Sequence, residues 1–333
     1  MTVGVGVTVG VGVTVGVGVP RIRGVAVGEA DGRLTVAIVG GGVVGERVRR
    51  NLASTTRLVP GDVGADVVVL ASAGSHSAHA AELLAGGSHV VSTSGRLADV
   101  REMLELDDVA RHAGVSMVVG AAVAPGLSGL LARHLTRRLT GCDELHIARH
   151  GTAGPSCARE HHHALRGWAL GWHDGQWIER PAGSGRELCW FPEPVGARDC
   201  YRGELADALL IHRGFPDVER ISARQSATRR DRLTARLPML SRPHAEGGIG
   251  ALRVEARGHD AAGARVTHII GIAELIGTAA AAMASAVVGV LQARVHHGGV
   301  ITTGDADLPA QPMLRAVLRY GVRLQEFNGV PVD

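Results

Sequence analysis

The sequence of 333 residues predicts an α/β fold with a parallel, doubly wound sheet. An apolar run at residues 36–39 leads directly into Gly40-x-Gly42-x-x-Gly45, and a helical segment follows. Strand patterns then alternate with helical patterns as far as residue 119, which is typical of parallel sheets. After about Cys142 the strand patterns become shorter, with arginine-rich and histidine-rich stretches between them. This change predicts a second α/β domain with a more open sheet.

The expected elements of the first region follow from the period of their apolar residues. We predict strands at residues 36–39, 57–59, 65–71, 89–92 and 115–119, and helices at residues 46–51, 77–85 and 97–113.

In the second region we predict strands at residues 144–148, 250–257 and 266–273. The stretch 275–291 is apolar nearly all round, but its alanine, glycine and serine make it only mildly hydrophobic. A buried helix that returns to the first domain is therefore favoured over a membrane span. Residues 311–322 predict a final amphipathic helix.

The composition excludes several kinds of chemistry. All 35 basic residues are arginine, so a lysine base, a lysine Schiff base and a P-loop are excluded. A net charge of +3 argues against a partner that is a nucleic acid. The four cysteines have no zinc-like spacing, and no signal peptide is recognisable, so we expect reduced thiols in a cytoplasmic protein.

The glycine motif carries the main functional prediction. A strand, Gly-x-Gly-x-x-Gly and a helix together are typical of a dinucleotide site, with the pyrophosphate on the first N–H groups of the helix. We therefore expect Gly40, Gly42, Val43, Val44 and Gly45 to bind a cofactor. A standard NAD site also places an acid about 20 residues further on, where it binds the ribose.

Two residues are candidates for the adenosine end of that site. Asp62 is the one acid near the expected distance, but it follows Pro60-Gly61, and a turn or cap role is at least as plausible for it. Arg57 would bind a 2′-phosphate and favour NADP, with an ordinary solvated arginine as the alternative. The choice between NAD and NADP stays open.

The order of motifs resembles the saccharopine dehydrogenase-like oxidoreductases. The matching segments are residues 40–45, 66–71, 90–95, 113–115, 124–132, 191–196, 298–300 and 319–322. The resemblance implies a Rossmann domain, an inserted α/β substrate domain and NAD(P)-dependent oxidation or reduction of an amino- or imino-acid-like compound. It also implies a nicotinamide site built from Ala71, Ser72, Ser94 and Gly95, with a substrate near Pro125 and Gly126. Relatives normally have a full strand, helix and strand between the motif and Asp66, whereas this region is abbreviated here.

The predicted organisation has three parts. Residues 1–33 begin with three copies of Thr-Val-Gly-Val-Gly-Val and are expected to be a disordered low-complexity leader. Residues 34–140 and 274–330 form the predicted dinucleotide-binding domain, and the C-terminal helix returns to it. Residues 141–273 form the predicted domain for substrate binding and dimerisation, with a homodimer as the default assembly.

Because the chain lacks lysine, the proton carrier must be another group. His150 and His161 are candidates, since histidine titrates near neutral pH. Glu193, between two prolines, would orient a base or an amine, or only shape a loop. The run His161–His163 lacks the spacing of metal ligands, and no metal site is predicted.

Arginine is the natural partner of a substrate carboxylate, because its planar fork binds both oxygens. The candidates are Arg149, Arg159 and Arg198, followed by Arg202 and Arg224, with surface ion pairs as the alternative for each. We thus predict an NAD(P)-dependent oxidoreductase acting on a small, carboxylate-bearing substrate. The alternatives are a redox-inactive binding or regulatory protein, and a non-redox enzyme that reuses the nucleotide cleft.

Overall fold

The computed structural model describes residues 33–239, 242–293 and 298–327. The repeat and nearly all of the predicted leader lie outside them. The first sheet has six parallel strands in the order β14-β5-β4-β3-β1-β2. Their bounds are β1 Thr35–Val39, β2 Arg57–Val59, β3 Val67–Leu70, β4 His89–Ser92, β5 Ser116–Val119 and β14 Gly299–Thr302. The parallel sheet that the alternating pattern predicts is confirmed.

Six helices accompany this sheet in the described residues: α1 Val43–Leu52, α2 Ser77–Ala85, α3 Leu97–Leu104, α4 Asp107–Ala113, α9 Ile276–Gln292 and α10 Ala310–Arg319. The prediction of one helix over residues 97–113 is wrong. The N–H groups of Glu105 and Leu106 bond three residues back, which tightens and ends α3. The Asp107 carboxylate then accepts a hydrogen bond from the Val300 N–H at 2.7 Å and ties α4 to β14.

The second sheet has nine strands and is mostly antiparallel. Its main path is β15-β13-β12-β6-β11-β10-β9, and β7 and β8 attach to β11. The bounds are β6 Gly141–His150, β7 Trp168–His173, β8 Gln176–Pro181, β9 Glu187–Trp190, β10 Ala197–Arg202, β11 Arg220–Ser226, β12 Ile249–His259, β13 Arg265–Leu275 and β15 Gln325–Phe327. Strand β15 thus joins the second sheet, although its residues fall in the range predicted for the first domain.

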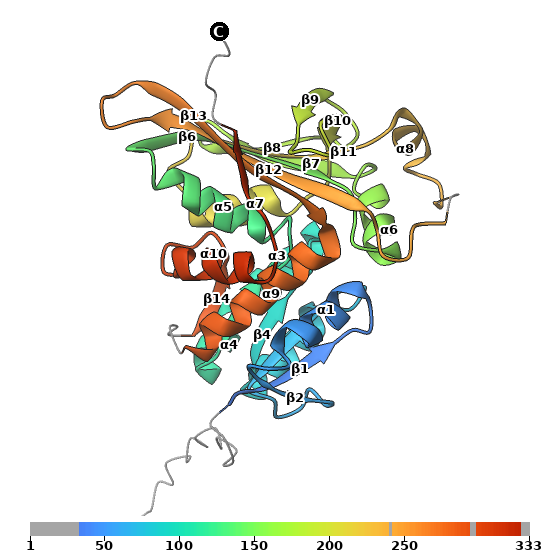
Figure 1. The fold of residues 1–333 in the computed structure, drawn as a ribbon, viewed down its shortest axis with the longest axis vertical. Helices are drawn as coiled ribbons and strands as arrows, with labels where there is room; N and C mark the ends of the chain where they lie inside the picture. Colours follow the sequence, from blue (N-terminus) through green and yellow to red (C-terminus); the bar gives the residue numbers. More distant parts are fainter. Residues whose placement is uncertain (1–32, 240–241, 294–297, 328–333) are drawn as a thin grey trace, which may run out of the picture. The chain divides into compact units, whose positions relative to one another are not determined.

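Helices pack between the two sheets (Figure 1). Helix α5, Leu127–Thr136, packs on β12 and β6, and α7, Asp207–Gly214, packs on β11. Helix α10 contacts both α5 and α9, and α9 lies against α1 and β4. The two remaining helices, α6 Pro155–His163 and α8 Arg229–Thr234, lie beside the second sheet. As predicted, the apolar stretch after residue 275 is a buried helix, and one core joins it to both sheets.

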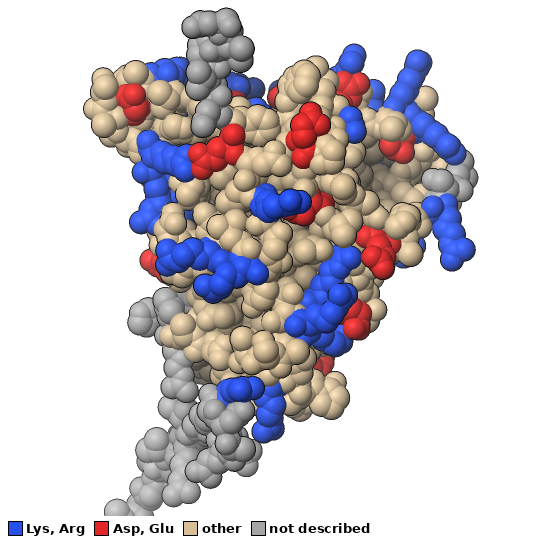
Figure 2. Space-filling model, viewed as in Figure 1, with Lys and Arg blue, Asp and Glu red and all other residues tan. Residues whose placement is uncertain are grey.

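No helix in the described ranges has both the length and the apolar character that crossing a bilayer requires. Figure 2 shows arginine and acidic side chains interspersed on one face of the molecule.

The abbreviation after the glycine motif is confirmed. Strand β2 has three residues and pairs with β1 only as far as Ala37, and no helix links β2 to β3. Beyond Ala37, the carbonyl groups on this side of β1 therefore have no partner from a neighbouring strand. The Arg49 guanidinium donates to two of them, the carbonyl oxygens of Ile38 at 2.7 Å and Gly40 at 3.0 Å.

Candidate functional site

A cleft with a volume of about 990 Å³ lies between the carboxyl ends of the first sheet and the start of the second. Its lining from the first sheet is residues 40–44, 71–74, 93–98 and 122–124. Its lining from the second part is residues 149–157, 159–161, 163, 164, 166 and 204, together with Ile276 and Ala280 of α9. Ligands of open α/β sheets bind at this edge of the sheet.

Glycines shape the wall of the cleft at the end of β1. Gly40 has φ +125°, and a Cβ there would lie 2.6 Å from the backbone of Ala71. A Cβ on Gly45 would collide with the carbonyl oxygen of Gly40, so glycine permits α1 to pack against β1. Gly42 is the N-cap of α1, makes no side-chain cap and has open space before it. The first N–H groups of α1 thus face the cleft.

The adjoining wall, after β3 and β4, is held by buried polar groups. Asp99 of α3 accepts hydrogen bonds from the N–H groups of His76 at 2.9 Å and Ser77 at 3.0 Å, and so caps α2. The ring of His76 bonds to Ser92 Oγ at 2.8 Å through Nδ1, and burial lowers its pKa. Through His76 and Ser92 these contacts hold the Ser72 carbonyl oxygen and the Ser94 N–H in place, and Ala71, Ser72, Ser94 and Gly95 all line the cleft.

Arg149, at the end of β6, forms the opposite wall. Its terminal nitrogens donate to the Ala124 carbonyl oxygen at 2.8 Å and to Gln225 Oε1 at 2.9 Å. Nε is buried and has no hydrogen-bond partner among the described residues. A guanidinium has four terminal N–H donors besides Nε–H, so two terminal N–H groups of Arg149 remain without a partner. Burial lowers its pKa, and the charge of Asp207 opposes that shift.

Asp207, the first residue of α7, lies behind Arg149 and is 1% exposed. Its Oδ1 accepts a hydrogen bond from Ser128 Oγ at 2.7 Å. Burial raises the pKa of Asp207, while the positive charge of Arg149 and the Ser128 bond lower it. The pair thus places a cation at the cleft with a carboxyl group nearby that partly compensates its charge, although the two side chains are not within ion-pair distance.

Two histidines lie beside Arg149 and share Ser226 as a partner. His150 bonds to Ser226 Oγ at 2.7 Å through Nδ1, and His161 Nε2 donates to the Ser226 carbonyl oxygen at 2.8 Å. Burial lowers the pKa of His150, as does the charge of Arg198. Burial also lowers the pKa of His161, to about 4, with Arg149 adding to the shift. Both rings line the cleft, and for both the lowered pKa favours the neutral form.

Helix α6 adds cleft residues that the sequence did not single out. Cys157 and Glu160 lie on its cleft side, and burial raises the pKa of both groups. Arg96 and Arg166 reach the same space from other loops. For Cys157 and Glu160 the one sequence signal is proximity to the glycine-rich turn before α6, which also marks the predicted Arg159. In the described parts of the chain, no group of three His, Cys, Asp or Glu side chains is arranged to hold a metal ion.

Several predicted residues lie outside the lining of the cleft. Arg57 pairs with Thr35 at the opposite end of β1, and Asp62 forms an ion pair with His79 of α2 at 2.9 Å. Glu193 and Arg198 are exposed on the loop after β9 and on β10. None of these four residues lines the cleft beside the glycine motif of residues 40–45.

Pro125 and Gly126 act behind the cleft wall. A Cβ on Gly95 would lie 2.9 Å from Pro125 Cδ, so the proline fills the space beside that glycine. Gly126 has φ +133°, and its carbonyl oxygen accepts a hydrogen bond from Thr303 Oγ1 at 2.6 Å. The two residues shape the loop whose Ala122–Ala124 segment lines the cleft.

A solved structure shares this overall fold. The chain is similar to the apo saccharopine dehydrogenase (L-Glu forming) of Saccharomyces cerevisiae, with a TM-score of 0.66 and 13% identity over 89% of this chain and 100% of that one. The fold is that of a saccharopine dehydrogenase.

Two further similarities are weaker. The DAP dehydrogenase of C. glutamicum in complex with DAP gives a TM-score of 0.46 and 15% identity over 87% of this chain and 99% of that one. A mutant meso-DAP dehydrogenase of Clostridium tetani with DAP gives a TM-score of 0.43 and 14% identity over 84% and 96%. No family model and no curated protein matches the sequence.

Proposed function

We propose that the chain is an NAD(P)-dependent oxidoreductase that acts on a small amino- or imino-acid-like substrate by hydride transfer. The observation that supports this best is that Arg149 and His150 line the same cleft as the glycine motif of residues 40–45. A bound nicotinamide cofactor supplies the hydride acceptor or donor. The protein must then supply a proton carrier and a group that orients the substrate.

The glycine wall fits a dinucleotide. The N–H groups at Val43 and Val44 begin a helix of ten residues without a side-chain cap, which suits a pyrophosphate. The open space before Gly41 and Gly42 allows a ligand to approach the backbone. Ala71, Ser72, Ser94 and Gly95 would hold the nicotinamide end.

Arg149 and His150 have complementary roles in this proposal. The two remaining terminal N–H groups of Arg149 would bind a substrate carboxylate, with Arg159 at the rim as a second cation. His150 would carry the proton, because Ser226 orients its Nδ1 and its pKa is low enough for a neutral ring to accept one. His161 would support it by holding the Ser226 backbone.

The experiment measures binding first and turnover second. We expect saturable binding of NADH or NADPH to the full chain, and turnover of at least one amino acid in a panel that contains dicarboxylic and dibasic members. His150→Gln should lower kcat by about 100-fold or more and leave cofactor binding within about twofold. Absence of saturable binding of either cofactor at millimolar concentration would contradict the proposal.

The alternative of a redox-inactive binding protein rests on one feature, the short β2. No acid of the described residues follows β2 into the cleft, and Arg49 occupies the free side of β1 instead. A cation there suits a 2′-phosphate better than a ribose hydroxyl. Tighter binding of NADPH than NADH, reduced by Arg49→Gln, would favour an active NADP enzyme, whereas cofactor binding without turnover would favour the alternative. The homodimer and the cytoplasmic location stay predictions.

A further inference from the structure

A second cavity lies in the second sheet and shares no lining residue with the cleft. Strand β11 pairs with β6 along its whole length on one side. On its other side, it pairs with β7 at Arg220 and Ile221 and with β10 from Arg224 onward. Two partners thus diverge from one strand, and the sheet forks between Ile221 and Arg224. The cavity, with a volume of about 300 Å³, lies at this fork.

Four arginines line the fork, and no acidic residue does. They are Arg180 of β8, Arg202 of β10, and Arg220 and Arg224 of β11. Glu187 pairs with Arg224 at 2.7 Å, and its side chain is 52% exposed. For the other three guanidinium groups, no carboxylate of a described residue lies within ion-pair distance. Burial lowers the pKa of Arg202 and the neighbouring arginines lower it further, while the charge of Glu187 opposes the shift.

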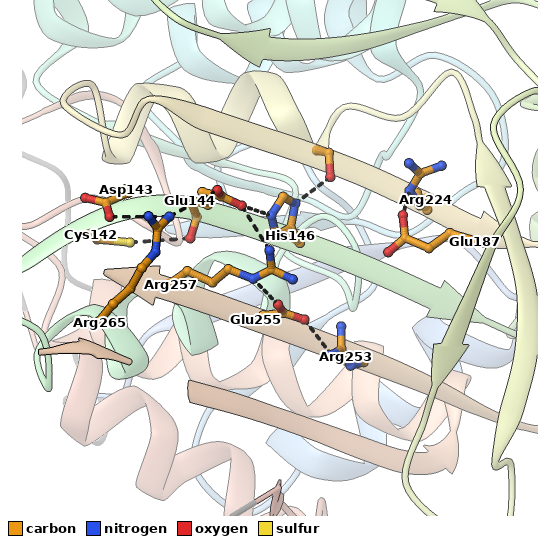
Figure 3. A network of polar contacts seen from close by, with 11 residues as sticks. Cys142, Asp143, Glu144, His146, Glu187, Arg224, Arg253, Glu255, Arg257 and Arg265 are labelled. Carbon is orange, nitrogen blue, oxygen red and sulfur yellow. Dashed lines mark hydrogen bonds and ion pairs between the residues drawn. The ribbon is translucent and has the colours of Figure 1, made fainter. Parts of the chain in front are cut away.

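On the same face of the sheet, other arginines are paired with carboxylates (Figure 3). Glu255 of β12 is 4% exposed and lies between Arg253 at 2.5 Å and Arg257 at 2.5 Å. Glu144 of β6 also pairs with Arg257, and it bonds to His146. His146 bonds in turn to Ser222 Oγ of β11, so this network ends at the fork. In this network each buried carboxylate contacts a guanidinium, whereas no carboxylate lines the cavity at the fork.

The loop between β8 and β9 positions Arg202 and Arg224. The N–H of Arg202 donates to the Ser184 carbonyl oxygen at 3.0 Å, and Gly183 donates to the Arg202 carbonyl oxygen at 2.8 Å. Gly185 has φ +62°, and a Cβ there would collide with the Arg202 guanidinium. The Gly185 carbonyl oxygen accepts a hydrogen bond from Arg224 Nη1. The loop thus positions two guanidinium groups side by side, at a cost in repulsion that a bound anion would remove.

We propose that this fork is a binding site for a small anion with two or more negative charges, on phosphate or carboxylate groups. The cavity is as large as the smaller sites for small molecules in proteins. Arginine forks match the geometry of both groups. The apolar residues Leu170, Trp172 and Ile178 also contribute to the lining of the cavity. The site is separate from the cleft and does not depend on the redox proposal.

The test titrates the full chain with pyrophosphate and, in a second arm, with citrate, and records the heat of binding at constant ionic strength. The test variant is Arg180→Gln/Arg202→Gln, because neither side chain has an ion pair in the described structure. The matched control is Arg101→Gln/Arg229→Gln, which removes the same charge from exposed positions on α3 and α8. We expect saturable binding of at least one probe, weakened about tenfold or more in the test variant and less than about twofold in the control.

The two arms distinguish the chemistry of the ligand. Preference for pyrophosphate indicates a phosphate ester, and preference for citrate indicates a polycarboxylate. Equal weakening in the test and control variants would mean that net charge alone attracts the probe and would overturn the proposal. So would unchanged binding in the test variant, or no saturable binding of either probe at about 10 mM. If the double variant does not fold, Arg220→Gln, an exposed position of the same cavity, gives the same reading with an expected loss of about threefold or more.

Discussion

The two walls of the cleft differ in whether main chain or side chains form them. The wall from the first sheet is backbone, in which glycines bring β1, α1 and the end of β3 close together. The wall from the second sheet is side chain, in which Arg149, His150 and His161 are held by Gln225 and Ser226. A substitution in the backbone wall disturbs the structure by steric collision. A substitution in the side-chain wall disturbs it by removing hydrogen-bond partners. Their responses to substitution should therefore differ in size and in kind.

The largest effect is expected in the side-chain wall. Arg149→Met leaves the Ala124 carbonyl oxygen and Gln225 Oε1 without their donor and Asp207 without its nearby cation. We expect the free energy of unfolding to fall by about 3 kcal/mol, measured by chemical denaturation. Arg159→Met removes the same charge from an exposed position and should change it by less than about 0.5 kcal/mol. Equal losses in both variants would show that Arg149 is not part of a buried network.

The backbone wall should respond to a single methyl group. In Gly45→Ala the new Cβ collides with the Gly40 carbonyl oxygen, so α1 must move away from β1. We expect a loss of about 1–3 kcal/mol of unfolding free energy, together with weaker binding of NADH or NADPH. Gly41→Ala is the control, because a Cβ there meets nothing within 4 Å. If Gly41→Ala cost as much stability as Gly45→Ala, the close approach would not be what requires glycine.

The smallest effect concerns pH and is confined to the side-chain wall. The pKa of His161 is about 4 in the fold, against 6.5 ordinarily, so between these values the unfolded chain binds the proton more readily. Its contribution to stability is therefore complete above pH 6.5 and is lost as the pH falls toward 4. His161→Gln keeps an N–H donor for Ser226 but does not titrate.

Denaturation from pH 7 to pH 4.5 measures this effect. The stability advantage of the natural chain over His161→Gln should shrink by about 1–2 kcal/mol as the pH falls. His112→Gln, at an exposed position on α4, should follow the natural chain in parallel. A pH slope that His161→Gln leaves unchanged would contradict the burial of this ring.

The same contrast explains what the sequence could predict. Gly40 and Gly45 were predictable because a backbone requirement leaves a local motif, and the short β2 was visible as missing residues. Arg149 was one of several arginines before the structure placed Ala124 and Gln225 beside it, from segments far apart in the chain. Glu193 and Arg198 have similar local signals, yet neither residue lines the cleft. Asp207 had no local signal, because its environment is made by tertiary packing.

The short β2 also affects how the molecule meets its neighbours. It is the outermost strand of the first sheet, and an exposed edge can pair with another chain. Three residues beginning with an arginine and followed by Pro60 offer little backbone for such pairing. Beyond them, Arg49 already occupies the carbonyl groups that a foreign strand would use. The abbreviation that removes the usual ribose contact therefore also closes the edge of the sheet against association.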